Sequence, residues 1–155
     1  MLQTFDKRNE HLKLNINGEL LHRNDAGISP FDSAVQGGDG VWEGLRLYKG
    51  RIFKLNEHLN RLRHSAQAMA FTDIPTNEEL TNEIAKTLTA NEMHDDVHIR
   101  LTLSRGVKIT SGMDPRLNQH GSTLIVIAEF KAPVYDSGGL SLITSSVRRF
   151  DPDMM

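Results

Sequence analysis

Three stretches of the chain have the hydrophobic pattern of β-strands. Residues 41–48 and 97–104 alternate between aliphatic and polar side chains, which places the aliphatic ones on one face of a strand and most of the polar ones on the other. Residues 123–130 are apolar almost throughout and predict a strand buried on both faces. A shorter strand over residues 51–53 follows the tight turn at Lys49-Gly50.

A β-hairpin is predicted near the start of the chain, where strands over residues 12–16 and 19–23 flank Asn17-Gly18. This pair readily takes the positive φ angles of a type I′ turn. Residues 24–36 have the composition of a loop, and no regular element is predicted there.

Two amphipathic helices are predicted between the strands. The first has Leu55 before it and Asn56 as its N-cap, and its apolar residues recur at three- and four-residue spacing. These residues are Leu59, Leu62, Ala66 and Met69. The second helix begins with Thr76 and Glu79 at capping-box spacing and has a similar apolar stripe. Its members are Leu80, Ile84 and Leu88.

The polar faces of the two alternating strands carry candidate binding residues. Trp42 and Gly44 share one such face, and the glycine either relieves crowding around the indole or allows a ligand to approach closely. His98 and Arg100 share the other, which is either solvent-facing or the wall of a polar pocket. The planar guanidinium of Arg100 would suit a carboxylate in such a pocket.

Arg61 lies beside the apolar stripe of the first helix, on a flank with His58 and Ser65. A charge in this position is usually solvated, so spacing alone favours a surface role over a ligand-binding role.

Composition narrows the class of protein. The 155 residues suffice for one domain with a modest core, and 38% hydrophobic and 25% charged residues are typical of a soluble globular protein. A net charge of -2 gives no electrostatic reason to expect nucleic acid or an anionic membrane as partner. The absence of cysteine excludes disulfides and thiolate chemistry. Without a signal-peptide core or a run of about 20 apolar residues, a cytoplasmic protein is predicted.

Other kinds of site are not supported by the spacing of residues. Gly37-Gly38-Asp39-Gly40 lacks the helix and the Lys-Ser/Thr pair of a phosphate-binding P-loop, and it is predicted to lead irregularly into the strand that follows. His94 and His98 are four apart, but they straddle a turn and a strand, so no metal site is predicted.

A set of motifs runs along most of the chain. It consists of Gly38-Asp39-Gly40-Val41-Trp42-Glu43-Gly44-Leu45-Arg46, Tyr48 with Gly50-Arg51-Ile52-Phe53, Glu57-His58-Leu59-Asn60-Arg61-Leu62 with Ser65-Ala66, His98-Ile99-Arg100, Ser104-Arg105-Gly106, and Ser145-Ser146-Val147-Arg148-Arg149. Together these motifs resemble the amino-terminal signature of the class IV pyridoxal-phosphate aminotransferases. That family includes branched-chain aminotransferases, D-amino-acid aminotransferases and aminodeoxychorismate lyases.

The resemblance implies a homodimer that binds pyridoxal 5′-phosphate, an amino acid and a 2-oxo acid. It also implies an α+β fold, a mainly antiparallel sheet with two flanking helices, followed by the first strand of an incomplete second domain. On this basis residues 1–131 would be the small α+β domain, residues 132–139 an interdomain linker, and residues 140–155 the start of a truncated large cofactor-binding domain. The strand of that second domain is expected over residues 140–147.

The resemblance also assigns roles to the candidate residues. Arg61 matches the arginine that binds the cofactor phosphate, and five other positions match residues around the substrate. These are Trp42, Gly44, His98, Arg100 and Arg105. Gly37 stands where relatives often have an aromatic residue, which weakens the expectation of a branched-chain substrate.

No catalytic residue is assigned, because the Schiff-base lysine of the family would lie beyond Met155. The 155-residue polypeptide alone is therefore predicted to be inactive. The predicted reaction of the full-length parent is transamination of a branched-chain-like amino acid. The alternatives are an aminodeoxychorismate lyase of the same fold and a non-catalytic module that dimerises or binds an anion at Arg61 and Arg100.

Overall fold

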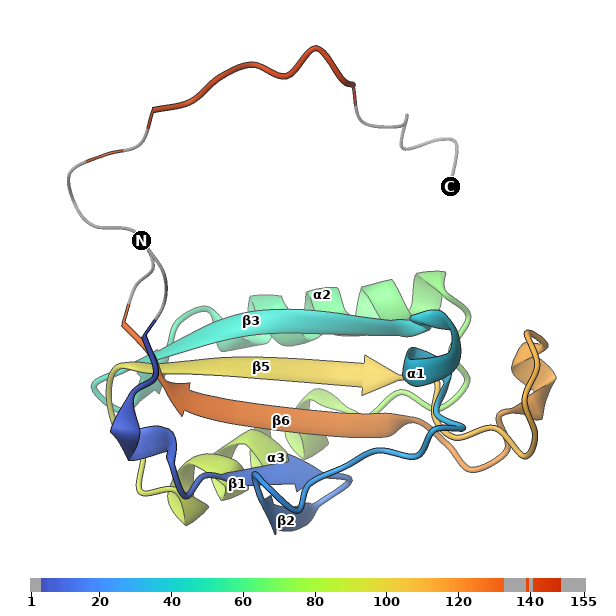
Figure 1. Ribbon diagram of the computed structural model, residues 1–155, viewed down its shortest axis with the longest axis horizontal. Coiled ribbons are helices and arrows are strands. Elements are labelled where there is room, and N and C mark those ends of the chain that lie inside the picture. The colour runs from blue at the N-terminus through green and yellow to red at the C-terminus, as the bar shows by residue number, and fades with distance from the viewer. Residues whose placement is uncertain (1–3, 133–138, 140, 149–155) are drawn as a thin grey trace.

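The computed structural model describes residues 4–132, 139 and 141–148, and its main feature is a six-stranded antiparallel sheet (Figure 1). The strand order is β2-β1-β6-β5-β3-β4. The strands are β1 (Lys13–Ile16), β2 (Glu19–His22), β3 (Gly40–Tyr48), β4 (Arg51–Ile52), β5 (Val97–Ser104) and β6 (Thr123–Phe130). The helices are α1 (Ser33–Gly37), α2 (Leu55–Ala68) and α3 (Asn77–Ala90), with 3₁₀ turns at Lys7–Asn9 and Pro115–Leu117. The predicted α+β fold with a mainly antiparallel sheet is confirmed.

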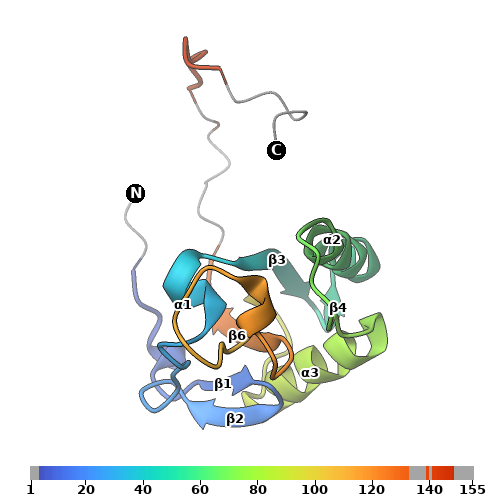
Figure 2. The same cartoon turned by 90° about the vertical axis from the view of Figure 1, so that its right-hand side faces the viewer.

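Helices α2 and α3 cover one face of the sheet, as Figures 1 and 2 show together. The core lies between these helices and the sheet. Fully buried side chains from both layers meet there, among them Leu45, Ile99, Leu101, Leu59, Leu62, Leu80 and Ile84. The predicted capping box of α3 is also present, because Thr76 and Glu79 exchange side-chain to backbone hydrogen bonds. Local sequence signals and packing therefore agree in this layer.

The turns between paired strands follow the sequence closely. Asn17 and Gly18 have φ angles of 50° and 85°, so the predicted type I′ turn between β1 and β2 is confirmed. Lys49 and Gly50 also take positive φ angles and join β3 to β4.

Three local predictions are wrong. The segment predicted as a loop contains α1, whose first turn is capped by the buried Asp32 and whose end is capped by Gly38 in the left-handed conformation. Helix α2 is preceded by Lys54 rather than capped by Asn56, and no side chain caps it. Met69 follows the end of this helix and is 38% exposed, so it does not continue the buried stripe.

Strand β6 is buried on one face only, which corrects the prediction for residues 123–130. Val126 and Ala128 are fully buried toward the helices, whereas Ile125 and Ile127 are half-buried on the opposite face. That second face, which we call the open face, is not covered by a helix of the described residues (Figure 2). It also carries the alternate residues of β3 and β5, which include most of the predicted substrate residues.

The strand expected over residues 140–147 is not formed. Residue 140 lies outside the described residues, and residues 141–148 contain no strand. Leu142, Ile143 and Val147 are exposed, which fits the absence of a partner strand or a packed layer that could hold them in a sheet. Residues 133–138 and 149–155, which hold most of the expected linker and the end of the expected second domain, also lie outside the described residues. Within the described part of the chain, no helix is both long and apolar enough to span a membrane.

Candidate functional site

A buried acid on β3 organises the first part of the site. Glu43 lies in the core phase of the strand, between Val41 and Leu45, and its side chain is only 7% exposed. Its two carboxylate oxygens accept hydrogen bonds from Arg61 on α2, with Nε to Oε1 at 2.5 Å and Nη2 to Oε2 at 2.6 Å. This is the bidentate geometry that gives an arginine–carboxylate pair its strength and its fixed orientation.

His58 completes this group, which we call the Glu43 cluster (Glu43, His58 and Arg61). Its Nδ1 lies 2.8 Å from Oε2 of Glu43. A carboxylate oxygen only accepts hydrogen bonds, so Nδ1 carries the proton and donates it. Burial alone would raise the pKa of the Glu43 carboxyl, but the hydrogen bonds from Arg61 and His58 outweigh burial and hold that pKa below its usual range. Glu43 is therefore ionised near neutral pH.

Arg61 is fixed on one side and open on the other. Its side chain is 65% exposed although Nε and Nη2 are held by the buried glutamate. Among the described residues, no hydrogen bond engages Nη1. The cluster thus presents the outer edge of a positively charged guanidinium to solvent, where it can bind an anion such as a phosphate.

The second part of the site lies on the open face. Arg100 pairs with Gly44 across the β3–β5 ladder, and its Cζ atom stacks 4.2 Å from the centroid of the Trp42 ring. Trp42 is 58% exposed, so the indole and the guanidinium together form an accessible amphipathic surface.

Gly44 lies between the side chains of Trp42 and His98. A Cβ atom built at Gly44 would meet His98 Nε2 at 3.4 Å and Trp42 Cζ3 at 4.0 Å, which are ordinary contact distances. Crowding around the indole therefore does not require a glycine here, and the interpretation that the position serves close approach by a ligand gains support. Burial, together with the nearby positive charges of Lys131 and Arg46, lowers the pKa of His98, so its imidazole is neutral at pH 7.

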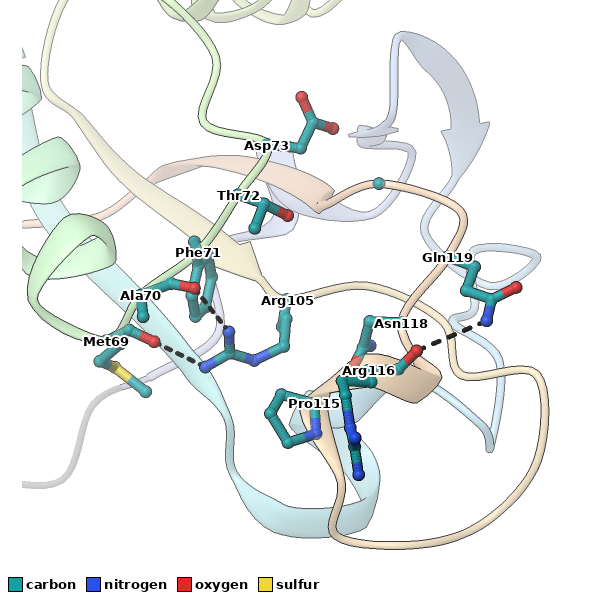
Figure 3. Close-up of a pocket in the computed structure, with 11 residues that line it drawn as sticks. Met69, Ala70, Phe71, Thr72, Asp73, Arg105, Pro115, Arg116, Asn118 and Gln119 are labelled. Atoms are coloured by element: carbon teal, nitrogen blue, oxygen red, sulfur yellow. Dashed lines mark hydrogen bonds between the residues drawn. The ribbon is translucent and has the colours of Figure 1, made fainter.

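Arg105 occupies a third position, at the end of β5. Its Nε donates to Oδ2 of Asp39 at 2.6 Å, and its Nη atoms donate to the backbone oxygens of Met69 and Ala70 at 2.7 and 3.0 Å (Figure 3). The guanidinium also stacks 4.6 Å from the ring centroid of Phe71. It forms one wall of a pocket of about 450 Å³ between the end of α2 and the 105–121 loop. In this arrangement Arg105 joins segments of the chain, and its proposed contact with substrate stays a prediction.

The predicted residues thus form two groups joined by β3. Trp42, Gly44, His98 and Arg100 come together on the open face, while Arg61 lies on the helix-covered side. Neighbouring residues of β3 belong to different groups, because Glu43 holds Arg61 and Gly44 faces Arg100.

Sequence reasoning missed Glu43 as a functional residue. The available signal was an acid in the aliphatic phase of a strand, with His58 and Arg61 one helical turn apart as possible partners. No group of three or more metal-binding side chains is found among the residues that the structure describes.

The fold places the chain among the aminotransferases. The branched-chain amino acid aminotransferase of the organism abbreviated T.th., solved with pyridoxamine 5′-phosphate, matches the structure with a TM-score of 0.77 and 28% identity, over 94% of this chain and 48% of that one. The sequence profile of the amino-transferase class IV family matches residues 40–154. The chain belongs to this family.

Two curated relatives extend the comparison. The branched-chain-amino-acid aminotransferase-like protein 2 of Arabidopsis thaliana is 55% identical over 139 residues, which are 89% of this chain and 25% of that protein. A putative branched-chain-amino-acid aminotransferase of Methanocaldococcus jannaschii is 39% identical over 145 residues, which are 93% of this chain and 49% of that protein. The chain therefore spans between a quarter and a half of the length of these relatives.

Proposed function

We propose that this chain is the amino-terminal part of an enzyme that uses pyridoxal 5′-phosphate to transfer an amino group between a branched-chain-like amino acid and a 2-oxo acid. The observation that carries the proposal is Arg61, whose guanidinium is fixed by a buried glutamate and exposed along its outer edge. This geometry fits the phosphate of the cofactor, because a preoriented arginine binds a phosphate without first losing its side-chain freedom. Family membership and a relative solved with the amino form of the cofactor support the same assignment.

The cofactor, when bound, supplies the electron sink that this chemistry needs. The residues of this chain bind and orient. Arg61 would hold the phosphate, and the open face would line the substrate site, with Arg100 available for a carboxylate and Trp42 for an apolar side chain. His98, neutral at pH 7, would act there as a hydrogen-bonding group rather than as a charge.

We further propose that two copies of the chain associate through the end of the molecule that carries α1. Four apolar side chains are exposed there, on α1, on the segment before it and on the 105–121 loop beside it (Figure 2). They are Phe31, Val35, Ile109 and Met113. Exposed apolar groups gathered at one end are typical of an interface. Sedimentation equilibrium would give twice the monomer mass if this proposal holds.

The experiment that tests the proposed function uses the product of the whole reading frame that contains this chain. It is incubated with L-leucine, L-valine or D-alanine and with 2-oxoglutarate, and glutamate formation is measured. Glutamate formed from a branched-chain donor is the expected result. Pyruvate released from aminodeoxychorismate without amino transfer would instead show the lyase reaction, and the absence of both would leave a binding module.

The role of Arg61 has its own test in the same protein. Arg61→Gln should weaken binding of pyridoxal 5′-phosphate by roughly 10- to 100-fold, as expected for the loss of a charge-assisted hydrogen bond to an anion. Arg116→Gln is the matched control, because Arg116 also pairs with a carboxylate, that of Asp114, but at the exposed tip of a loop. Equal cofactor binding in the two variants would contradict the assignment.

A further inference from the structure

We infer that Glu43, with His58, is a positioning residue that presents Arg61 to its anionic ligand. This inference rests on the proposed function, because it concerns the same arginine. Glu43 is unusual as a buried acid in a strand whose neighbouring core positions are aliphatic. Burying a carboxylate is unfavourable unless it is paired, and both of its oxygens are paired here.

The contacts determine which part of Arg61 is available. The bidentate pair takes Nε and one hydrogen of Nη2, which leaves the Nη1 side of the planar group facing solvent. His58 donates to the same oxygen that Nη2 contacts, so the carboxylate is held from two sides by residues one helical turn apart. An exposed arginine without such contacts would sample many rotamers and lose that freedom on binding.

The charge of Glu43 and its contact with Arg61 lead to opposite expectations for binding. Glu43 is a negative charge next to the arginine that would hold a phosphate. If only its charge mattered, removing it would strengthen binding of a dianionic phosphate group, since like charges repel. If it positions Arg61, removing it weakens binding although the site becomes more positive.

The first measurement is the dissociation constant of pyridoxal 5′-phosphate, by equilibrium dialysis with the product of the whole reading frame. Glu43→Gln should weaken binding by roughly 2- to 12-fold, the equivalent of ordering one long side chain anew. Glu43→Asp keeps the charge but shortens the side chain, so it should also weaken binding. In an Arg61→Gln background neither change should have a further effect, because the effect of Glu43 acts through Arg61.

Glu57→Gln is the matched control for charge. Glu57 lies in the first turn of α2, 62% exposed, and forms an ion pair with Lys54 at 3.4 Å. The change alters net charge as Glu43→Gln does without touching the Glu43 cluster. It should leave binding unchanged or make it slightly stronger.

The second measurement reports on the arginine itself. In ¹⁵N-edited NMR spectra of the 155-residue chain, the Nε–H proton of Arg61 should exchange with water about tenfold faster in Glu43→Gln than in the wild type, because its hydrogen bond to a carboxylate is lost. This readout does not require the cofactor. A side chain that only filled space in the core would not change it.

The outcomes separate the inference from the function on which it rests. Tighter binding in Glu43→Gln, or unchanged binding in Glu43→Asp, would overturn the positioning role while a loss in Arg61→Gln still supports the proposed function. Unchanged binding in Arg61→Gln would overturn both the phosphate assignment and the positioning role. Weaker binding in both Glu43 variants, absent in the Arg61→Gln background, would establish the role.

Discussion

The buried carboxyl group of Asp32 is the place where a single substitution should most affect stability. Asp32 is fully buried, and its Oδ2 accepts hydrogen bonds from Ser104 Oγ at 3.0 Å and from Thr123 Oγ1 at 2.7 Å. Its Oδ1 caps α1 by accepting from the backbone N–H of Ala34 at 2.9 Å. One side chain therefore joins the start of α1 to the end of β5 and the start of β6.

Asp32→Ala would leave the hydroxyl groups of Ser104 and Thr123 buried without their acceptor. Each such group costs about 1–2 kcal/mol, and loss of a helix cap costs about 1 kcal/mol more. We therefore expect the free energy of unfolding to fall by about 3–5 kcal/mol, a large part of the roughly 5–15 kcal/mol of an ordinary domain. Urea denaturation followed by circular dichroism measures this change.

Two controls make the prediction specific. Asp114→Ala removes another aspartate that caps a turn, through a 2.9 Å bond from the backbone N–H of Arg116, but this carboxylate lies at the surface and its loss should have a much smaller effect. Thr123→Val should destabilise the wild type, yet have little effect or a compensating one in Asp32→Ala, because the orphaned hydroxyl is then removed. A loss below about 1 kcal/mol in Asp32→Ala would refute the reasoning about buried donors.

Two further predictions concern backbone conformation and electrostatics. Gly106→Ala should destabilise the chain strongly, because φ is +103° and the new Cβ would lie 1.8 Å from the backbone oxygen of Gly121, whereas Gly27→Ala, which meets no atom within 4 Å, should leave the denaturation midpoint nearly unchanged. Hydrogen bonds from Arg116 lower the pKa of Asp114 to about 2, so Arg116→Gln should raise the titration midpoint of that carboxyl toward 3.8 in an NMR titration, and an unchanged midpoint would contradict this cause.

The sequence was informative where local pattern and packing coincide. Alternation in residues 97–104, the Asn17-Gly18 turn and the Thr76–Glu79 capping box each predicted an element that the structure contains. The apolar run of β6 misled because aliphatic side chains occupy both of its faces while helices cover only one. Helix α1 was missed because it has five residues, too few to show a period.

The candidate site was harder to predict, because its main contact joins two elements. Glu43 and Arg61 are 18 residues apart, on a strand and a helix, and no spacing rule relates such positions. Motif resemblance found Arg61 but not the acid that holds it. The position of Glu43 in the strand did carry a signal, since an acid among core residues implies a buried partner.

The three arginines of the site differ in how far the chain already uses them, and this difference ranks them as ligand-binding groups. Arg105 donates to a carboxylate and to two backbone oxygens, so a ligand would have to replace an ion pair and the contacts between segments. Arg61 is engaged along one edge, which orients it and leaves the other edge open. Arg100 rests on the face of Trp42, a contact that leaves its donors directed outward for a planar carboxylate. We therefore expect a substrate carboxylate to bind at Arg100 rather than at Arg105, with the phosphate at Arg61.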